Sequence, residues 1–163
     1  MGAGKSAVGA LLARRLERPF VDLDSRIEEQ SGQAIRQIFE MEGQAAFREL
    51  ESTCLRGLAD DVPAVVALGG GVQSVPENRA WLSSHGITVW LDVPFDELVT
   101  RLGREECRAR PLWGTTEEAR QLYLARLADY GDSDLRIEVS STKSVEEVAA
   151  TVHQLLEDQL CGI

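Results

Sequence analysis

The sequence has few cysteines, no excess of positive charge and no long apolar run, and each shortage excludes a class of protein. Cys54, Cys107 and Cys161 are an odd and scattered set among 163 residues. They have neither metal-ligand spacing nor the pattern of a disulfide framework, so we expect incidental thiols and a cytoplasmic location. Lys and Arg number 17 against 27 Asp and Glu, and the net charge of −10 argues against nucleic acid or a membrane surface as a partner. No run of residues is long and apolar enough to predict a membrane span.

Lysine is almost absent, with Lys5 and Lys143 as the only two, and Lys5 lies in the most informative segment. Residues 1–6 read Met-Gly-Ala-Gly-Lys-Ser, which matches the end of a phosphate-binding loop. In such a loop, backbone N–H groups turn toward a phosphate, the lysine reaches the β- and γ-phosphates, and the Ser6 hydroxyl can ligate Mg²⁺. The alternative is a flexible glycine-rich terminus. Apolar residues at helical spacing favour the loop, because they predict that a helix follows it: Val8, Leu11, Leu12 and Leu16.

Helices and strands alternate along the chain, which predicts one α/β domain. Helices are expected over residues 5–18, 76–84, 95–102, 116–129 and 144–160, and over most of 25–60 with breaks at 31–32 and 42–43. Strands are expected over residues 19–24, 64–68, 87–93 and 135–139. This alternation indicates a three-layer parallel sheet with helices on both faces. The phosphate loop also demands a fifth strand directly before it.

Two aspartates, Asp22 and Asp24, end the first expected strand. Residues two apart on a strand point to the same face, and the carboxyl ends of parallel strands face the crevice where ligands bind. One carboxylate could hold Mg²⁺ through water while the other orients a substrate hydroxyl. The alternative is a pair of turn aspartates that cap the next helix.

Three consecutive glycines, Gly69, Gly70 and Gly71, follow the second expected strand. They allow backbone N–H groups to approach a small polar ligand closely, although an unusual strand-to-helix turn would also use glycine. Because three glycines exceed what one turn needs, the pattern favours a ligand-binding role.

Arginines provide a third group of candidate residues. Arg101, Arg104, Arg108 and Arg110 fall in or beside residues 103–115, a polar and aperiodic segment that we interpret as a lid. Arginine can stabilise a phosphoryl group during transfer, whereas any single one could be a solvated surface residue. Two further arginines on expected helices could pair with a carboxylate bidentately: Arg48 and Arg126.

Together these residues resemble the shikimate kinase family, small P-loop enzymes similar to nucleoside monophosphate kinases. The resemblance spans nearly the whole chain and depends on the order of its motifs. They are Gly-Ala-Gly-Lys-Ser at 2–6, Asp-Leu-Asp at 22–24 followed by Ile27-Glu28, Ser31-Gly32 followed by Ile35 and Ile38-Phe39, Glu42-Gly43, Phe47-Arg48-x-x-Glu51, Leu68-Gly69-Gly70-Gly71, Arg110-Pro111-Leu112, and Arg126 four residues before Tyr130. The order of these motifs is far more restrictive than the phosphate loop alone.

The resemblance implies transfer of the γ-phosphoryl group of ATP to the 3-hydroxyl of shikimate, with Mg²⁺ as cofactor, ATP and shikimate as partners, and a monomer. It assigns ATP binding to Gly2, Ala3, Gly4, Lys5, Ser6, Ala7, Arg101, Arg110 and Lys143, and the metal to Ser6 and Asp22. It implies that Glu51 orients Arg48, and it assigns shikimate binding to Asp24, Phe39, Phe47, Arg48, Gly69, Gly70, Gly71 and Arg126. It also assigns catalytic roles to Asp24 as proton acceptor, to Lys5 and to the lid residue Arg110. Residues 25–60 would form the shikimate-binding region and residues 103–115 the lid.

The chain departs from the family at its beginning. The leading glycine of the loop would stand two residues before Met1, and the central strand of the family's sheet is missing; Ala7 also replaces a common threonine. We expect two exposed sheet edges and a long apolar slot where that strand would lie. A misplaced start codon or a truncation would explain this, and upstream coding sequence for an apolar strand would support the hypothesis.

Two alternative functions remain open from the sequence. One is another small-metabolite kinase, such as a gluconate kinase. It would not need both Arg48 and Arg126, which suit a carboxylated ring. The other is a non-catalytic remnant that binds nucleotide or shikimate without turnover, and the missing strand is its only support.

Overall fold

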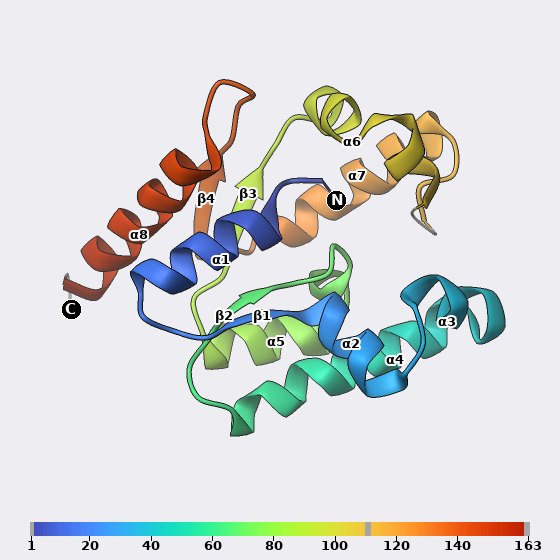
Figure 1. Ribbon diagram of the computed structural model, residues 1–163, viewed down its shortest axis with the longest axis horizontal. Coiled ribbons are helices and arrows are strands. Elements are labelled where there is room, and N and C mark those ends of the chain that lie inside the picture. The colour runs from blue at the N-terminus through green and yellow to red at the C-terminus, as the bar shows by residue number, and fades with distance from the viewer. Residues whose placement is uncertain (1, 110–111, 162–163) are drawn as a thin grey trace.

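The computed structural model describes residues 2–109 and 112–161 (Figure 1). Its helices are α1 (Lys5–Arg15), α2 (Leu23–Ser31), α3 (Ile35–Met41), α4 (Gly43–Arg56), α5 (Pro76–His85), α6 (Phe95–Ala109), α7 (Thr116–Tyr130) and α8 (Val145–Cys161), with short 3₁₀ helices η1 (Gly57–Asp60) and η2 (Val72–Ser74). Its strands are β1 (Phe20–Asp22), β2 (Val65–Ala67), β3 (Val89–Asp92) and β4 (Leu135–Glu138). The expected alternation of helices and strands is confirmed.

The four strands form two separate parallel pairs. In the first pair β1 lies beside β2, with Phe20 opposite Val65 and Asp22 opposite Ala67. In the second pair β3 lies beside β4, with Val89 opposite Leu135. Within the described residues no strand joins β2 to β3, so the expected single sheet is divided in two.

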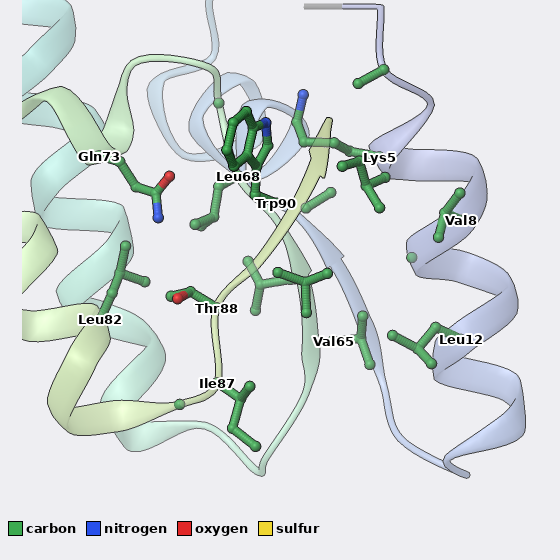
Figure 2. Close-up of a pocket in the computed structure, with 18 of the residues that line it drawn as sticks. Lys5, Val8, Leu12, Val65, Leu68, Gln73, Leu82, Ile87, Thr88 and Trp90 are labelled. Atoms are coloured by element: carbon green, nitrogen blue, oxygen red, sulfur yellow. The ribbon is translucent and has the colours of Figure 1, made fainter. Parts of the chain in front are cut away.

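An apolar cavity of about 720 Å³ separates the two strand pairs, and we call it the inter-sheet slot. Val65 of β2, Leu91 of β3 and Leu12 of α1 line it, and Figure 2 shows side chains from both strand pairs and from α1 around it. The expected slot and its two facing sheet edges are therefore confirmed. Lys5 at the start of α1 and Ala3 before it also line the slot, so part of the phosphate loop borders this cavity.

Each strand pair has its own hydrophobic core. Around β3 and β4, helix α1 packs on α8, and the core includes Val8, Val93, Ile137, Val148 and Val152. Around β1 and β2, helices α2, α3 and α4 pack on one another, and the core includes Leu23, Ile27, Ile38, Phe47 and Leu55. Because α1 also contacts β1 and β2, it connects the two halves beside the slot.

Two boundaries differ from the sequence-based expectation. The first strand ends at Asp22 instead of Asp24, because the chain turns there into α2. The segment 103–115 is not aperiodic throughout, since α6 continues to Ala109. Gly103 breaks that helix with φ 65° and ψ 172°, a backbone conformation that glycine adopts without strain, and helix-compatible residues follow it.

Over the part of the chain that the structure describes, no helix has the length and hydrophobicity required to cross a bilayer.

Candidate active site

The phosphate-loop residues form the N-terminal end of α1. Gly4 caps this helix with φ 81°, and no side chain caps it by hydrogen bonding. The first-turn N–H groups of a helix have no intrahelical acceptor, and the helix dipole adds partial positive charge at the same end. Lys5 and Ser6 stand in that first turn, so a cation and a hydroxyl accompany several N–H groups at the helix end that favours an anion.

Asp22 connects this helix end to the first strand pair. Ser6 Oγ donates a hydrogen bond of 2.5 Å to Asp22 Oδ2. The other carboxylate oxygen, Oδ1, accepts from the backbone N–H groups of Asp24 and Ser25 at 3.1 and 3.5 Å and caps α2. Asp22 therefore caps the helix, as the alternative interpretation expected, and also accepts a hydrogen bond from the phosphate loop, while its role in metal binding stays a prediction.

The same pair of oxygens fits a magnesium ion. Mg²⁺ prefers hard oxygen ligands and is commonly bound through one or two carboxylates together with substrate phosphates and water. Ser6 and Asp22 supply a hydroxyl and a carboxylate. The residues described contain no group of three or more His, Cys, Asp or Glu side chains able to hold a metal alone. The arrangement suits a metal that arrives with a phosphate ligand.

Asp24 stands in the first turn of α2, so the expectation that Asp22 and Asp24 share one face of a strand is wrong. The helical turn instead directs Asp24 toward the glycine segment, residues 69–71. A Cβ built on Gly69 would lie 2.9 Å from Asp24 Oδ1 and 2.5 Å from Glu51 Oε1. Only glycine allows these two carboxyl groups to approach the backbone so closely, which explains the residue at this position.

Arg48 and Glu51 form an ion pair on one face of α4, three residues apart. Glu51 is fully buried, and Arg48 also lies 5.2 Å from the ring centroid of Phe47. Phe47 in turn packs on Phe39 at 4.7 Å between ring centroids. A Cβ on Gly71 would collide with the Arg48 guanidinium, 2.6 Å from Nη1. The predicted acceptor-site residues on α3, α4 and the glycine segment are therefore in contact.

Arg126 approaches the same segment from α7. It is 7% exposed, and burial lowers its pKa although the charges of Tyr130 and Glu51 act in the opposite direction. The Tyr130 hydroxyl donates a 2.6 Å hydrogen bond to the backbone oxygen of Gly70. One buried and one partly buried guanidinium group near a single buried carboxylate favour an anionic ligand between them.

Glu51 gives the site a measurable pH dependence. Burial raises the pKa of Glu51, and the nearby charge and hydrogen bond of Arg48 only partly offset this. A carboxyl group whose pKa is higher in the folded protein contributes most stability below its unfolded pKa of about 4.3, and this stability is lost as the pH rises through the folded pKa. Glutamine resembles the protonated form at every pH.

We therefore expect the free energy of unfolding of Glu51→Gln, minus that of the unsubstituted chain, to increase as the pH rises from about 4 to 8. Urea unfolding at several pH values measures this difference. Glu49→Gln, an exposed position on the same helix, is the matched control. A difference that stays constant or decreases with pH would contradict the account of Glu51.

Three further residues are expected to bind ATP, Arg101 and Lys143 beside the adenine and Arg110 at the phosphates. Arg101 forms an ion pair with Glu97 at 3.3 Å on α6, and Lys143 donates to the backbone oxygen of Glu138 at 3.1 Å after β4. Arg110 lies outside the described residues. These three assignments stay predictions.

Sequence reasoning missed the bond from Tyr130 to Gly70. The four-residue spacing between Arg126 and Tyr130 was visible, but it carries no information about a contact sixty residues away. Predicting this hydrogen bond requires knowing which distant segments lie side by side in the fold.

The chain is similar in sequence and structure to known proteins over most of its length. The family profile described as shikimate kinase matches residues 1–157. The chain is 41% identical to the shikimate kinase of Microcystis aeruginosa over 97% of this chain and 85% of that protein, and 43% identical to that of Geobacter sulfurreducens over 93% and 84%. Among solved structures, shikimate kinase from Acinetobacter baumannii in complex with shikimate superimposes with a TM-score of 0.91 at 34% identity, covering 98% of this chain and 89% of that one.

Proposed function

The chain belongs to the shikimate kinase family, and from this premise we propose that it transfers the γ-phosphoryl group of ATP to the 3-hydroxyl of shikimate. One observation supports this most strongly: Arg48 and Arg126, both largely buried, converge on the glycine segment beside Asp24. This arrangement suits a small ring that carries one carboxylate and several hydroxyls. The bond between Ser6 and Asp22 connects the phosphate loop to the same end of the first strand pair.

In this proposal, Arg48 and Arg126 bind the shikimate carboxylate, and the ion pair with Glu51 fixes the orientation of Arg48. A bidentate arginine–carboxylate pair supplies both energy and direction, which a ring with several hydroxyls needs in order to present one of them. The backbone of Gly69, Gly70 and Gly71 contacts the ring hydroxyls, and the apolar face of the ring lies near Phe39 and Phe47. A glycine backbone permits this approach because no side chain intervenes.

ATP binds at the end of α1. The backbone N–H groups of residues 2–7 surround its phosphates, and Lys5 places a cation against the β- and γ-phosphates. Ser6 and Asp22 would hold Mg²⁺, which neutralises phosphate charge when it is bound. Arg101 and Lys143 are assigned to the adenine side, and Arg110 to the phosphates from the lid.

Asp24 is the proton acceptor in this proposal. As the 3-hydroxyl oxygen forms its bond to the γ-phosphorus, the bond to the β–γ bridging oxygen breaks, and Asp24 takes the hydroxyl proton. Positioning and charge neutralisation account for most of the rate in such transfers, and water must be excluded because it competes as an acceptor.

Residues 25–60 are proposed as the shikimate-binding region and residues 103–115 as the lid that closes over both substrates. The break at Gly103 supports a hinge at the start of the lid, since it interrupts α6 without strain. We also propose that the protein is a monomer located in the cytoplasm.

Arg126→Ala tests the acceptor site. Loss of a charged, buried hydrogen-bonding partner costs about 1.5–3 kcal/mol, so we expect the shikimate KM to rise roughly 10- to 100-fold. The ATP KM should change far less, because Arg126 contacts only the acceptor. Steady-state kinetics with each substrate varied in turn measures both.

Arg120→Ala is the matched control, because Arg120 lies on the same helix but pairs with Asp96 at 2.7 Å, away from the glycine segment. Equal increases in both KM values for Arg126→Ala would contradict its assignment. Gluconate, tested as an alternative acceptor, should give no ADP release above background.

A further inference from the structure

The C-terminal end of α7 is attached to α5 and η2, which pack in the core around β1 and β2, by polar contacts of Arg79 and Gln73. Arg79 Nη1 donates to the backbone oxygen of Gln73 at 2.6 Å and to Asp129 Oδ1 at 3.0 Å. Its Nε also lies 3.7 Å from Asp132 Oδ2. Next to this bridge, Gln73 Nε2 donates to Ser133 Oγ at 3.2 Å. The bridge therefore joins the segment that follows the glycines to the last turn of α7.

The charge arrangement explains why α7 needs a partner there. A helix C-terminus carries partial negative charge, and acidic side chains near it are unfavourable. Asp129 and Asp132 stand at this end, and the last turn of α7 contains no basic residue. Arg79 supplies the missing cation from another helix. Its side chain is 29% exposed and that of Asp129 is 25% exposed, so solvent weakens this pair less than a fully exposed one.

The same helical turn carries the acceptor-site residues. Arg126 precedes Asp129 by three residues, so the two lie on adjacent positions of one helix face. Tyr130, next to Asp129, donates to the backbone oxygen of Gly70. A displacement of the last turn of α7 would therefore move Arg126 relative to the glycine segment.

We propose that Arg79 is a positioning residue that sets the placement of Arg126 against the glycine segment, and so controls shikimate affinity. This inference rests on the proposed function of the site. Arg79 touches neither substrate in that function and acts only through α7.

Arg79→Gln tests the inference. We expect the shikimate KM to rise roughly 3- to 10-fold, with kcat and the ATP KM within about twofold of the unsubstituted chain. Arg120→Gln, which removes an ion pair at the other end of α7, should leave the shikimate KM unchanged. Charge exchange, Arg79→Asp combined with Asp129→Arg, should recover most of the affinity.

A double-mutant cycle separates positioning from general structural support. If Arg79 acts through Arg126, adding Arg79→Gln to Arg126→Ala should raise the shikimate KM no further. Should Arg79→Gln be too unstable to assay, Arg79→Lys keeps the charge but loses part of the donor geometry and should give a smaller rise.

The outcomes are distinct. Additive effects in the cycle, an unchanged shikimate KM in Arg79→Gln and Arg79→Lys, or equal changes in kcat and the ATP KM would overturn the role of Arg79. Failure of the unsubstituted chain to turn over shikimate would instead reject the proposed function itself.

Discussion

Replacement of Asp24 by asparagine is expected to lower kcat by about 10²- to 10⁴-fold, the usual contribution of a positioned general base. Asparagine has nearly the same shape and can occupy the first turn of α2, but it cannot accept the proton of the reacting hydroxyl. ADP affinity should stay close to that of the unsubstituted chain, because the phosphate loop is formed by α1 and not by α2. Single-turnover kinetics and ADP titration by calorimetry measure the two quantities.

Glu29→Gln provides the matched control for this variant, since Glu29 is an exposed carboxylate on the same helix. It should have nearly unchanged kcat. A kcat for Asp24→Asn within a few-fold of the unsubstituted chain would remove Asp24 from the mechanism. The proton would then have to leave by another route.

The second large effect is expected for Lys5→Ala. Removing one preorganised charge at a phosphoryl-transfer site should reduce kcat by at least about 10²- to 10³-fold. Lys5 stands in the first turn of α1, where its ammonium adds to the N–H groups and the helix dipole. Because these groups bind ATP and not shikimate in the proposed function, shikimate binding should persist in the variant, and calorimetry with shikimate can verify that the site remains intact.

Arg14→Ala is the control for Lys5→Ala, because Arg14 is an exposed cation near the other end of α1. It should keep normal turnover. Similar losses in both variants would mean that the charge of α1 as a whole, and not a phosphate contact of Lys5, determines the rate.

Local patterns in the sequence predicted the helices and strands, whereas the roles of the site residues stay predictions. The helix after Gly4 follows from its apolar spacing, and the glycine segment follows from three adjacent glycines after a buried strand. The alternation of apolar and polar residues over 20–24 predicts a strand that includes Asp24, although the same residues can also begin a helix. Because Asp22 caps α2, that helix begins at Leu23, two residues earlier than the pattern indicated.

Contacts between distant segments could not be predicted from local patterns in the sequence. Arg79 on α5 and Asp129 on α7 are fifty residues apart, and neither local segment shows any periodicity or motif that links them. The inter-sheet slot was predictable for a different reason. It followed from a resemblance that spans the chain and includes the order of strands, which local patterns do not specify.

The most direct test is shikimate-dependent ADP release by the chain of residues 1–163 with ATP and Mg²⁺, with Lys5→Ala measured in parallel. Mass spectrometry of the acceptor identifies the product. We expect ADP release that requires both shikimate and Lys5, together with a monophosphorylated shikimate. ADP release that is independent of shikimate, or thermal stabilisation by shikimate without any phosphorylated product, would contradict it.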